Sequence, residues 1–553
     1  MNENDNNSNN YQGANQSGNM YSYNNDQQQS QIKETDAIRR SLGEINPNAV
    51  QEEQYINNVN PNPNPNNEVV DPNTIVIEID QSPPLYWMFF LILGIIQALF
   101  IIFLANYYDW DELNDTSKHG DQINRNAKEK IEKYYKTFQD INVMIFLGFG
   151  FLRTMLKHHS WSSLALTLLG GVLSFEFGLF AMICWSSILR QDWYNGIFNF
   201  RYMLDSNYCA AATVIAMGAI FGKLFFAQYI VMILTSTAFS TLNYTLIRQK
   251  LHCIDTGGTI TVHLFGAVFG AVFTFICFNT KSEKDRIQTS RHLGKNYYSV
   301  LFALFGTLIL ISYWPSFNTG LIEGNQKYRG IINTYFSVGG SIIGTFFVTS
   351  ILNHRKFKVE DIINSSFAGG IVIAGCCSII KAFWLSIIFG IIAGGLSSSL
   401  FFLLNDKLIK VGYHDTAGIL YFHGFPGLLG GIFSTIFVGS LSLWDKLNNV
   451  DDNFLYMSLI DDFLPEIKAG NVTYLYRNDI GMGGRAWIQF GCVFLTIVIA
   501  AASGLFSGFL IKFCNCEIVK TYFNDSEFFD VSDNEPFPWE DEKVLIKLNY
   551  HKN

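Results

Sequence analysis

The sequence predicts an all-α polytopic membrane protein with about 12 transmembrane helices. Two observations of composition indicate this class. Hydrophobic residues make up 49% of the chain and charged residues only 15%, which is too few charges for soluble domains of this length. The apolar residues also gather in blocks of about 20, the length that a helix needs to cross a hydrocarbon core of roughly 30 Å. A third observation, a repeated motif inside two of these blocks, indicates how the helices are organised.

The repeated motif begins with an aspartate and carries one histidine into an apolar segment. The first copy starts at Asp255 and reaches His263, and the second starts at Asp415 and reaches His423. Both read D-T-x-G, four residues, then H-x-F, and such agreement at fixed offsets indicates an internal repeat. An ionisable side chain inside a membrane span is costly to bury and therefore marks a functional site. The two histidines are the first candidates.

The chain divides into a head, a membrane domain and a tail. Residues 1–84 are rich in Asn, Gln, Asp and Ser and are expected to be disordered, since they cannot bury enough apolar surface to fold. The membrane domain is expected at residues 85–515, followed by an acidic cytoplasmic tail at 516–553. Spans are expected at 85–104, from about 138 through 151, and at 163–188, 207–226, 228–247, 257–278, 298–317, 331–352, 362–380, 382–404, 416–438 and 487–513.

An even number of spans places both termini on one side of the membrane. The basic stretches 281–295 and 354–358 favour a cytoplasmic side for their loops, and hence for both termini. The loop after the first span is also Lys-rich, which disagrees, but it carries the glycosylation sequon at Asn114 and is expected outside. A second sequon, at Asn471, lies in another outer loop. The expected location is the cell membrane.

The two copies of the motif fall in the sixth and eleventh spans, whose span numbers differ by five, an odd number, so the copies run in opposite directions. Spans 2–6 and 7–11 then form a five-helix inverted-topology repeat, with a site at the membrane midplane. Eight residues separate each aspartate from its histidine, which is about 12 Å of helix. Entering from opposite faces of a core roughly 30 Å thick, the imidazoles are left roughly 6 Å apart in depth. We therefore expect them close enough to share a hydrogen bond.

The residues around each histidine have structural interpretations. Asp255 and Asp415 are expected to cap their helices by accepting N–H groups of the first turn, with direct contact to an ion as the alternative. Gly258 and Gly418 indicate close helix packing. Pro426 is expected to kink the helix beside His423. The histidines themselves have a structural alternative, an imidazole bonded to a neighbouring helix.

Two chemistries suit paired histidines in an apolar setting. One is a haem held between helices by axial imidazoles. The other is a narrow apolar conduit in which neutral imidazoles donate and accept hydrogen bonds or relay a proton. Its substrate would be a small molecule that sheds its charge at the entrance, such as ammonium passing as ammonia. The nine cysteines lie in or beside apolar segments, as small buried hydrophobes do. We expect no metal, cofactor, enzymatic activity or nucleic-acid partner.

The sequence resembles the Rhesus glycoprotein branch of the ammonium transporter superfamily over about residues 85–515. The residues that carry the resemblance are Phe138-Gln139-Asp140 through Phe151, Asp255 to Gly266, Tyr313-Trp314-Pro315-Ser316-Phe317-Asn318, Ile332-Asn333-Thr334-Tyr335, Asn364-Ser365 to Gly370, and His414-Asp415 to Gly427. The resemblance implies a homotrimer in lipid, with one pore per subunit that conducts ammonia with or without its proton.

The same resemblance assigns roles to single residues. The family's twin pore histidines fall on His263 and His423, its stacked phenyl gate on Tyr208 and Phe317, and its acidic residue before the first histidine on Asp255. Asn318 belongs to the pore motif that contains Phe317. Tyr208 departs from the family, which usually has Phe, so its hydroxyl is expected to wet the gate or bind incoming ammonium. Glu176 also departs from the family pattern. It is expected to be either a charge in the outer vestibule or a packing partner of a neighbouring helix.

Two functions remain beside the leading one. The chain is alternatively a trimeric structural anchor that transports nothing, or a channel for CO2 or another gas. The two tails are candidates for cytoskeletal or regulatory partners in any of these cases.

Overall fold

The computed structural model describes residues 76–79, 84–110, 128, 131–191, 196–198, 200–279, 287, 294–447, 482–513, 522–525, 528–529 and 545–548. Contacts within the chain divide it into two units. One comprises residues 82–535, and the other comprises residues 1–81 together with 536–553. Each unit is described by itself.

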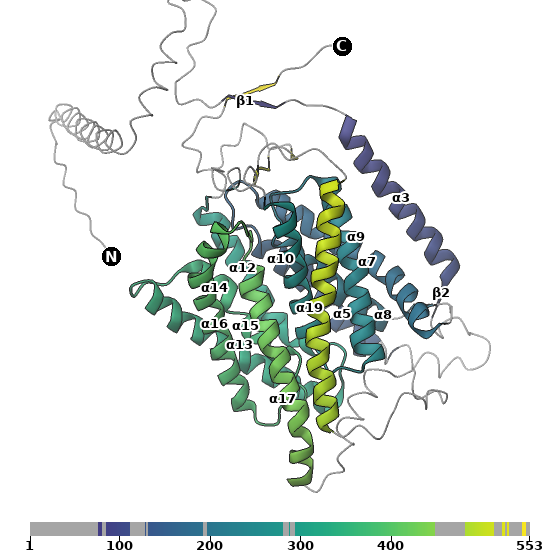
Figure 1. Cartoon of the computed structure of the whole chain (residues 1–553), viewed down its shortest axis with the longest axis vertical. Coiled ribbons are helices and arrows are strands. Elements are labelled where there is room, and N and C mark those ends of the chain that lie inside the picture. The colour runs from purple at the N-terminus through teal and green to yellow at the C-terminus, as the bar shows by residue number, and fades with distance from the viewer. Residues whose placement is uncertain are drawn as a thin grey trace, which may run out of the picture. The chain divides into compact units, whose positions relative to one another are not determined.

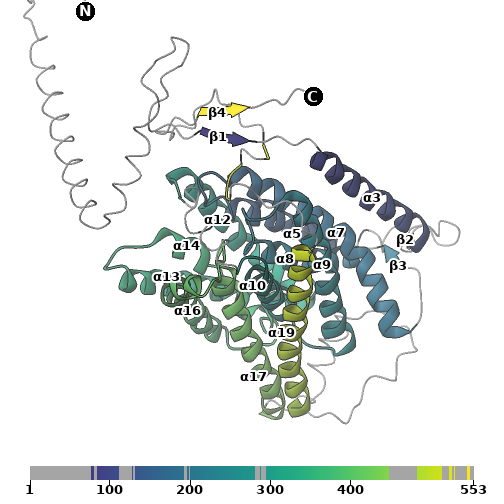
Figure 2. The same cartoon turned by 45° about the horizontal axis from the view of Figure 1, so that its top comes forward.

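The smaller unit contains two short strands. Strand β1 (Val76–Ile79) pairs in parallel with β4 (Leu545–Leu548), with Glu78 opposite Lys547 (Figure 2). The sequence predicts a disordered head at residues 1–84 and an acidic cytoplasmic tail at 516–553. The rest of the head and most of the tail lie outside the described residues, so the division at 84 and 516 stays a prediction.

The larger unit is almost entirely helical in its described residues (Figure 1). Its longer helices are α3 (Pro84–Tyr107), α7 (Ser160–Arg190), α8 (Phe200–Met217), α9 (Phe226–Tyr244), α10 (Phe265–Cys277), α12 (Tyr297–Thr319), α13 (Gly324–Leu352), α16 (Phe383–Lys410), α17 (Phe425–Leu447) and α19 (Met482–Phe513). Shorter helices are α5 (Lys136–Asn142), α6 (Phe149–Leu152), α14 (Val359–Ser365) and α15 (Ala368–Ala374). Strands β2 (Tyr108–Trp110) and β3 (Gly196–Phe198) form a parallel pair.

Five π-helical stretches interrupt or extend the α-helices of this unit. They are η2 (Ile131–Tyr135), η3 (Val143–Gly148), η4 (Thr245–Lys250), η5 (Thr259–Leu264) and η7 (Leu420–Gly424), counted within the described part of the chain. The last two directly precede α10 and α17. Because π-turns inside helices occur often at functional sites, their position in the two repeat copies bears on the site below.

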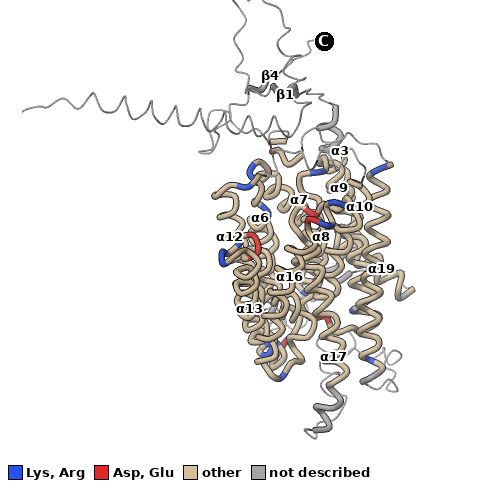
Figure 3. Tube along the Cα trace, turned by 60° about the vertical axis from the view of Figure 1, so that its left-hand side comes forward, with Lys and Arg blue, Asp and Glu red and all other residues tan. Residues whose placement is uncertain are grey.

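The predicted class, an all-α polytopic membrane protein, is confirmed. Within the described residues, eight helices are long and apolar enough to cross a membrane, and a shorter apolar stretch spans Phe90–Asn106. The remaining predicted spans coincide with the series η2 to α6, with α8, and with the pair α14 and α15. Figure 3 shows that most of the described helical residues are neither basic (Lys, Arg) nor acidic (Asp, Glu).

The boundaries of two predicted spans are wrong. The fourth span was expected at 207–226, but α8 begins at Phe200 and ends at Met217, and residues 218–224 form turns. Gly222 in this stretch has a φ of 78°, which no helix accommodates. The ninth span was expected as one helix from 362 to 380, but it is broken between Ser365 and Ala368, and its helical part ends at Ala374.

The two repeat copies lie against each other and run in opposite directions. A methyl group added at Gly430 would meet Thr259, one at Gly427 would meet Leu264, and one at Gly424 would meet Ala267. Residue numbers in these contacts therefore increase along the second copy while they decrease along the first. The segments are antiparallel, as an inverted-topology repeat requires, and their glycines allow the close approach.

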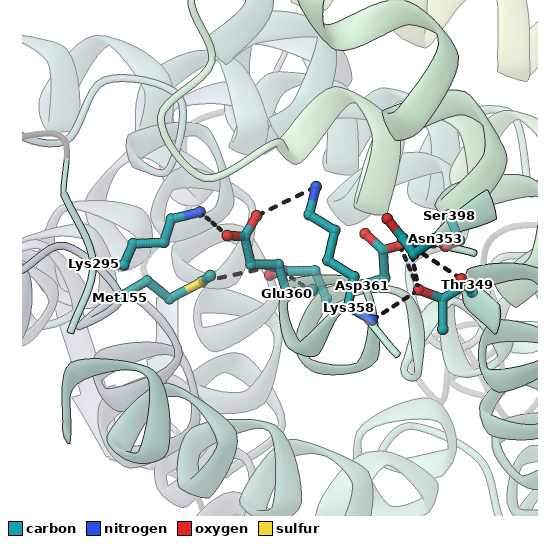
Figure 4. Close-up of polar contacts among 9 residues, drawn as sticks. Met155, Lys295, Thr349, Asn353, Lys358, Glu360, Asp361 and Ser398 are labelled. Carbon is teal, nitrogen blue, oxygen red and sulfur yellow. Dashed lines mark hydrogen bonds and ion pairs between the residues drawn. The ribbon is translucent and has the colours of Figure 1, made fainter. Parts of the chain in front are cut away.

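Polar contacts fix the first turn of α14 (Figure 4). Glu360 forms ion pairs with Lys295 and Lys358. Asp361 accepts hydrogen bonds of 3.0 Å from the hydroxyls of Thr349 in α13 and Ser398 in α16. Acidic side chains also suit the positive end of a helix dipole. Lys358, one of the basic residues used to orient the chain, therefore has a structural partner as well.

Candidate functional site

Both candidate histidines lie in π-helical turns that follow a glycine in left-handed conformation. His263 is in η5 after Gly258, whose φ is 72°, and His423 is in η7 after Gly418, whose φ is 68°. The backbone N–H of His263 donates to the carbonyl of Gly258 at 3.0 Å, five residues back. The two copies of the motif therefore build the same local structure.

The glycines are required by conformation and by space. A residue with a Cβ is strained at this φ, and a Cβ at Gly258 would run into Val262, as one at Gly418 would run into Phe422. The contacts of both glycines are with residues of their own turn, so close packing between helices at these positions stays a prediction. Each glycine starts its helix in a conformation that other residues rarely adopt.

The motif aspartates cap these turns. Asp255 accepts the N–H of Ile260 at 3.1 Å, and the N–H and hydroxyl of Thr261 at 2.8 and 2.7 Å. Asp415 accepts the N–H of Leu420 at 3.0 Å and the hydroxyl of Tyr413 at 2.9 Å. Both carboxylates are buried. Each satisfies donors at the start of its helix, which is the capping role, and Asp255 has more of them to satisfy.

The structure brings the two histidines together. Their Nδ1 atoms lie 3.3 Å apart, and their rings are nearly parallel, with centroids 5.4 Å apart. Trp314 stacks on the ring of His263 at 5.8 Å, and Phe367 packs on His423 at 5.3 Å. All four side chains are buried. The Nε2 atom of His263 has no hydrogen-bond partner among the described residues.

This geometry does not fit a haem held between the two imidazoles. The macrocycle would have to lie between the ligating nitrogens, and nitrogens within hydrogen-bond distance of each other leave no space for it. Among the described residues, no group of three or more His, Cys, Asp or Glu side chains is placed to hold a metal ion either.

Tyr208 and Phe317 lie next to the pair, toward Asp255. Their ring centroids are 4.8 Å apart, and the ring of Phe317 is 5.9 Å from that of His263. The hydroxyl of Tyr208 donates to the backbone carbonyl of Phe317. This bond ties the two aromatic residues to each other, and it occupies the hydroxyl proton that was expected to wet the gate.

The line of rings continues on the other side of the histidines. Phe149 lies 6.0 Å from the ring of His423, and the guanidinium carbon of Arg153 lies 5.5 Å from the centroid of Phe149. Sequence reasoning missed both residues. For Arg153 a signal existed, because it is a charged residue that directly follows the apolar G-F-G-F-L stretch.

Three other candidates have definite places. Asn318 donates its amide to the hydroxyl of Thr334 at 3.1 Å and to the carbonyl of Gly370 at 2.9 Å, while its buried Oδ1 has no partner among the described residues. Pro426 is the second residue of α17, directly after η7, so the irregularity beside His423 is a π-turn.

Glu176 accepts a 2.6 Å hydrogen bond from Gln97 of α3, which is the packing role. Asn114 and Asn471 lie outside the described residues.

Comparisons with known proteins cover most of the chain. The family model described as Ammonium Transporter Family matches residues 122–521. Ammonium transporter Rh type B-A of Xenopus laevis is 30% identical over 431 residues, which is 76% of this chain and 87% of that protein. Ammonium transporter Rh type C of Oryctolagus cuniculus is 29% identical over 456 residues, or 80% and 90% of the two chains.

Solved structures share the fold. Rh50 of Nitrosomonas europaea superposes with a TM-score of 0.58 at 24% identity, covering 73% of this chain and 93% of its own. Mep2 of Saccharomyces cerevisiae superposes with a TM-score of 0.51 at 15% identity, covering 69% and 84%. At these identities the likeness concerns the arrangement of the helices.

Proposed function

We propose that this chain, which belongs to the Ammonium Transporter Family, conducts ammonia along the line of rings that runs past His263 and His423. The resemblance to the Rhesus branch is confirmed by the Rh-type relatives. The chain is thus an ammonium or ammonia channel or transporter, and the proposal concerns how it works. The observation that carries it is the contact between the two Nδ1 atoms, 3.3 Å apart at the centre of an apolar segment.

The contact fixes what the pair offers to a passing molecule. In a neutral pair, one Nδ1–H donates to the other Nδ1, so the two rings have opposite tautomers. The donating ring then has a bare Nε2 that accepts a hydrogen bond. The accepting ring has its own proton on Nε2 and donates. Ammonia can both donate and accept hydrogen bonds. The pair of His263 and His423 offers it one acceptor and one donor.

Ammonium has to lose its proton before it passes. In the proposed sequence, ammonium reaches Tyr208 and Phe317, one N–H bond breaks, and the proton returns to water on the side of entry while neutral ammonia moves on. Burial in apolar surroundings penalises a charged group strongly and a neutral amine much less. Potassium has no proton to lose and is therefore held back by the same surroundings.

The test is ammonia flux through the chain reconstituted in liposomes. An ammonium gradient should change the internal pH faster than in empty liposomes, which ammonia enters only through the lipid, and current measured on the same vesicles shows whether charge accompanies it. A chain that inserts, changes pH no faster than empty liposomes and carries no current would instead support the structural anchor. A faster CO2-driven signal without a faster ammonium-driven one would support the gas channel.

Assembly and placement are part of the proposal. We expect a homotrimer in the cell membrane with both termini in the cytoplasm. The tails are candidates for cytoskeletal or regulatory partners.

Glycan mapping tests the orientation. In a glycosylating host, Asn114 or Asn471 should carry a glycan, because both sequons lie in loops expected outside, and Asn364 in α14 should not. Loss of a gel shift in Asn114→Gln or Asn471→Gln measures this. A glycan confined to the N-terminal head would reverse the orientation.

Replacing Phe317 with alanine should weaken discrimination against bulky or charged solutes. The ring packs on both Tyr208 and His263, so its removal opens space at the entrance. We expect methylammonium to pass faster relative to ammonia, measured as pH change in proteoliposomes. Tyr208→Phe is the matched control, since it removes only the hydroxyl and should retain most discrimination. If Phe317→Ala matched wild type in flux and selectivity, Phe317 would play no part in a gate.

A further inference from the structure

Arg153 lies at the end of the line of rings on the Asp415 side. Its guanidinium carbon lies 5.5 Å from the centroid of Phe149 and 5.0 Å from that of Phe221. A Cβ at Gly218 would lie 3.1 Å from this carbon and 2.7 Å from Ile419, which precedes His423 by four residues, about one helical turn. The side chain is 6% exposed. The guanidinium therefore sits about one turn from the histidine pair, between α8 and the start of the second copy.

The guanidinium has few partners for a buried cation. Its Nε and Nη1 atoms have no hydrogen-bond partner among the described residues, and its Nη2 donates only a long bond, 3.5 Å, to the carbonyl of Ile215. Within the described part of the chain, no carboxylate lies within ion-pair distance of it. Buried charges normally have partners, so a structural role explains Arg153 poorly.

Lys223, on the same side, shows what a structural cation looks like. Its ammonium donates to the carbonyls of Ala219 and His414 at 2.6 and 2.8 Å and to the hydroxyl of Thr274 at 2.9 Å. All three of its protons are used. Lys223 thus joins the two halves of the repeat, while most N–H groups of Arg153 remain available.

The charges around Arg153 do not neutralise it. Asp415, the motif aspartate on this side, accepts hydrogen bonds from Leu420 and Tyr413. Asp525 accepts the N–H groups of Trp161 and Ser162 at the start of α7. A guanidinium does not deprotonate in proteins, so a positive charge stays beside the conduit.

We propose that Arg153 is a specificity-determining residue that repels cations at the Asp415 end of the conduit. Repulsion between like charges is strong in a low-dielectric setting, and a fixed arginine in a narrow pore excludes protons and cations in this way. Ammonia is neutral and passes. The inference rests on the proposed function and deepens it, because it makes conduction electroneutral: the proton left at the entrance cannot follow through the pore.

The experiment compares wild type with Arg153→Met, Arg153→Gln and Arg153→Lys in proteoliposomes. Ammonia-driven pH change and ammonium- or potassium-driven current are measured on the same vesicles. Both neutral variants should raise the cation current about tenfold or more, with ammonia flux at or above wild type. Arg153→Lys keeps the charge and should remain as silent as wild type. Arg153→Gln can still donate to Ile215, so it serves where Arg153→Met fails to fold.

Each outcome bears on one claim. Neutral variants that remain electrically silent, with ammonia flux like that of wild type, would overturn the role of Arg153 and leave the proposed function intact. Currents equally large in Arg153→Lys would overturn it too, because charge would not be the cause. Absence of ammonia flux in wild type would instead overturn the proposed function itself.

Discussion

His263→Ala and His423→Ala are each expected to remove most ammonia flux while the protein still folds and reaches the membrane. Each imidazole supplies half of a donor and acceptor pair, because the Nδ1 atoms are 3.3 Å apart and bond each other. Removal of one ring leaves the other without its partner and free to take either tautomer. It also opens an apolar cavity between the aromatic neighbours Trp314 and Phe367. Each variant should therefore conduct poorly, or admit potassium, and the loss should be of similar size in both.

The measurement is ammonia-driven pH change beside potassium permeability in proteoliposomes of equal protein content. His354→Ala is the control, since that histidine is exposed and lies far along the chain from both motif copies. Wild-type ammonia flux together with intact exclusion of potassium in both histidine variants would make the pair structural. A loss in only one variant would contradict the equal roles that the tautomer argument requires.

Much of the site follows from one repeated pattern. Because the copies lie in the sixth and eleventh predicted spans, they have to run in opposite directions. Equal offsets from Asp255 and Asp415 then bring His263 and His423 to within roughly 6 Å of each other in depth. The antiparallel contacts between Gly430 and Thr259 and between Gly424 and Ala267 agree with that reasoning. These inferences succeed because periodicity and span count depend on the sequence alone.

The rest depends on packing, which a single sequence does not encode visibly. Nothing in the motif predicts a π-turn at each histidine. Pro426 follows His423 in one copy, but the equivalent position in the other copy is Gly266, so no shared residue signals the turn. The hydroxyl of Tyr208 is expected from the sequence to wet the gate or to bind incoming ammonium, yet it donates to the carbonyl of Phe317. The sequence alone is compatible with two roles for Glu176, and the hydrogen bond that it accepts from Gln97 favours packing. In each case the partner is distant in sequence.

Asp255→Ala is expected to destabilise the protein by about 2 to 4 kcal/mol, because a lost helix cap costs about 1 kcal/mol and buried donors left without an acceptor add about 1 to 3 kcal/mol. The carboxylate is fully buried and accepts the N–H groups of Ile260 and Thr261 as well as the hydroxyl of Thr261. These bonds hold the turn that carries His263. We therefore expect lower thermal stability in detergent and little ammonia flux, while Asp255→Asn, which keeps one acceptor oxygen, should fall between.

The comparison with Asp415→Ala decides between capping and direct contact with an ion. Asp415 accepts the backbone N–H of Leu420 at 3.0 Å and the hydroxyl of Tyr413 at 2.9 Å, whereas Asp255 accepts two backbone N–H groups and a hydroxyl. If capping is the role, Asp255→Ala should lower the melting temperature more than Asp415→Ala, because more donors lose their acceptor. If the Asp255→Ala protein has the melting temperature of wild type but needs far more ammonium for half-maximal flux, the role of Asp255 is direct contact with the ion. Asp255 would then act on the ion itself, and the turn around His263 would be held by its glycine and its packing.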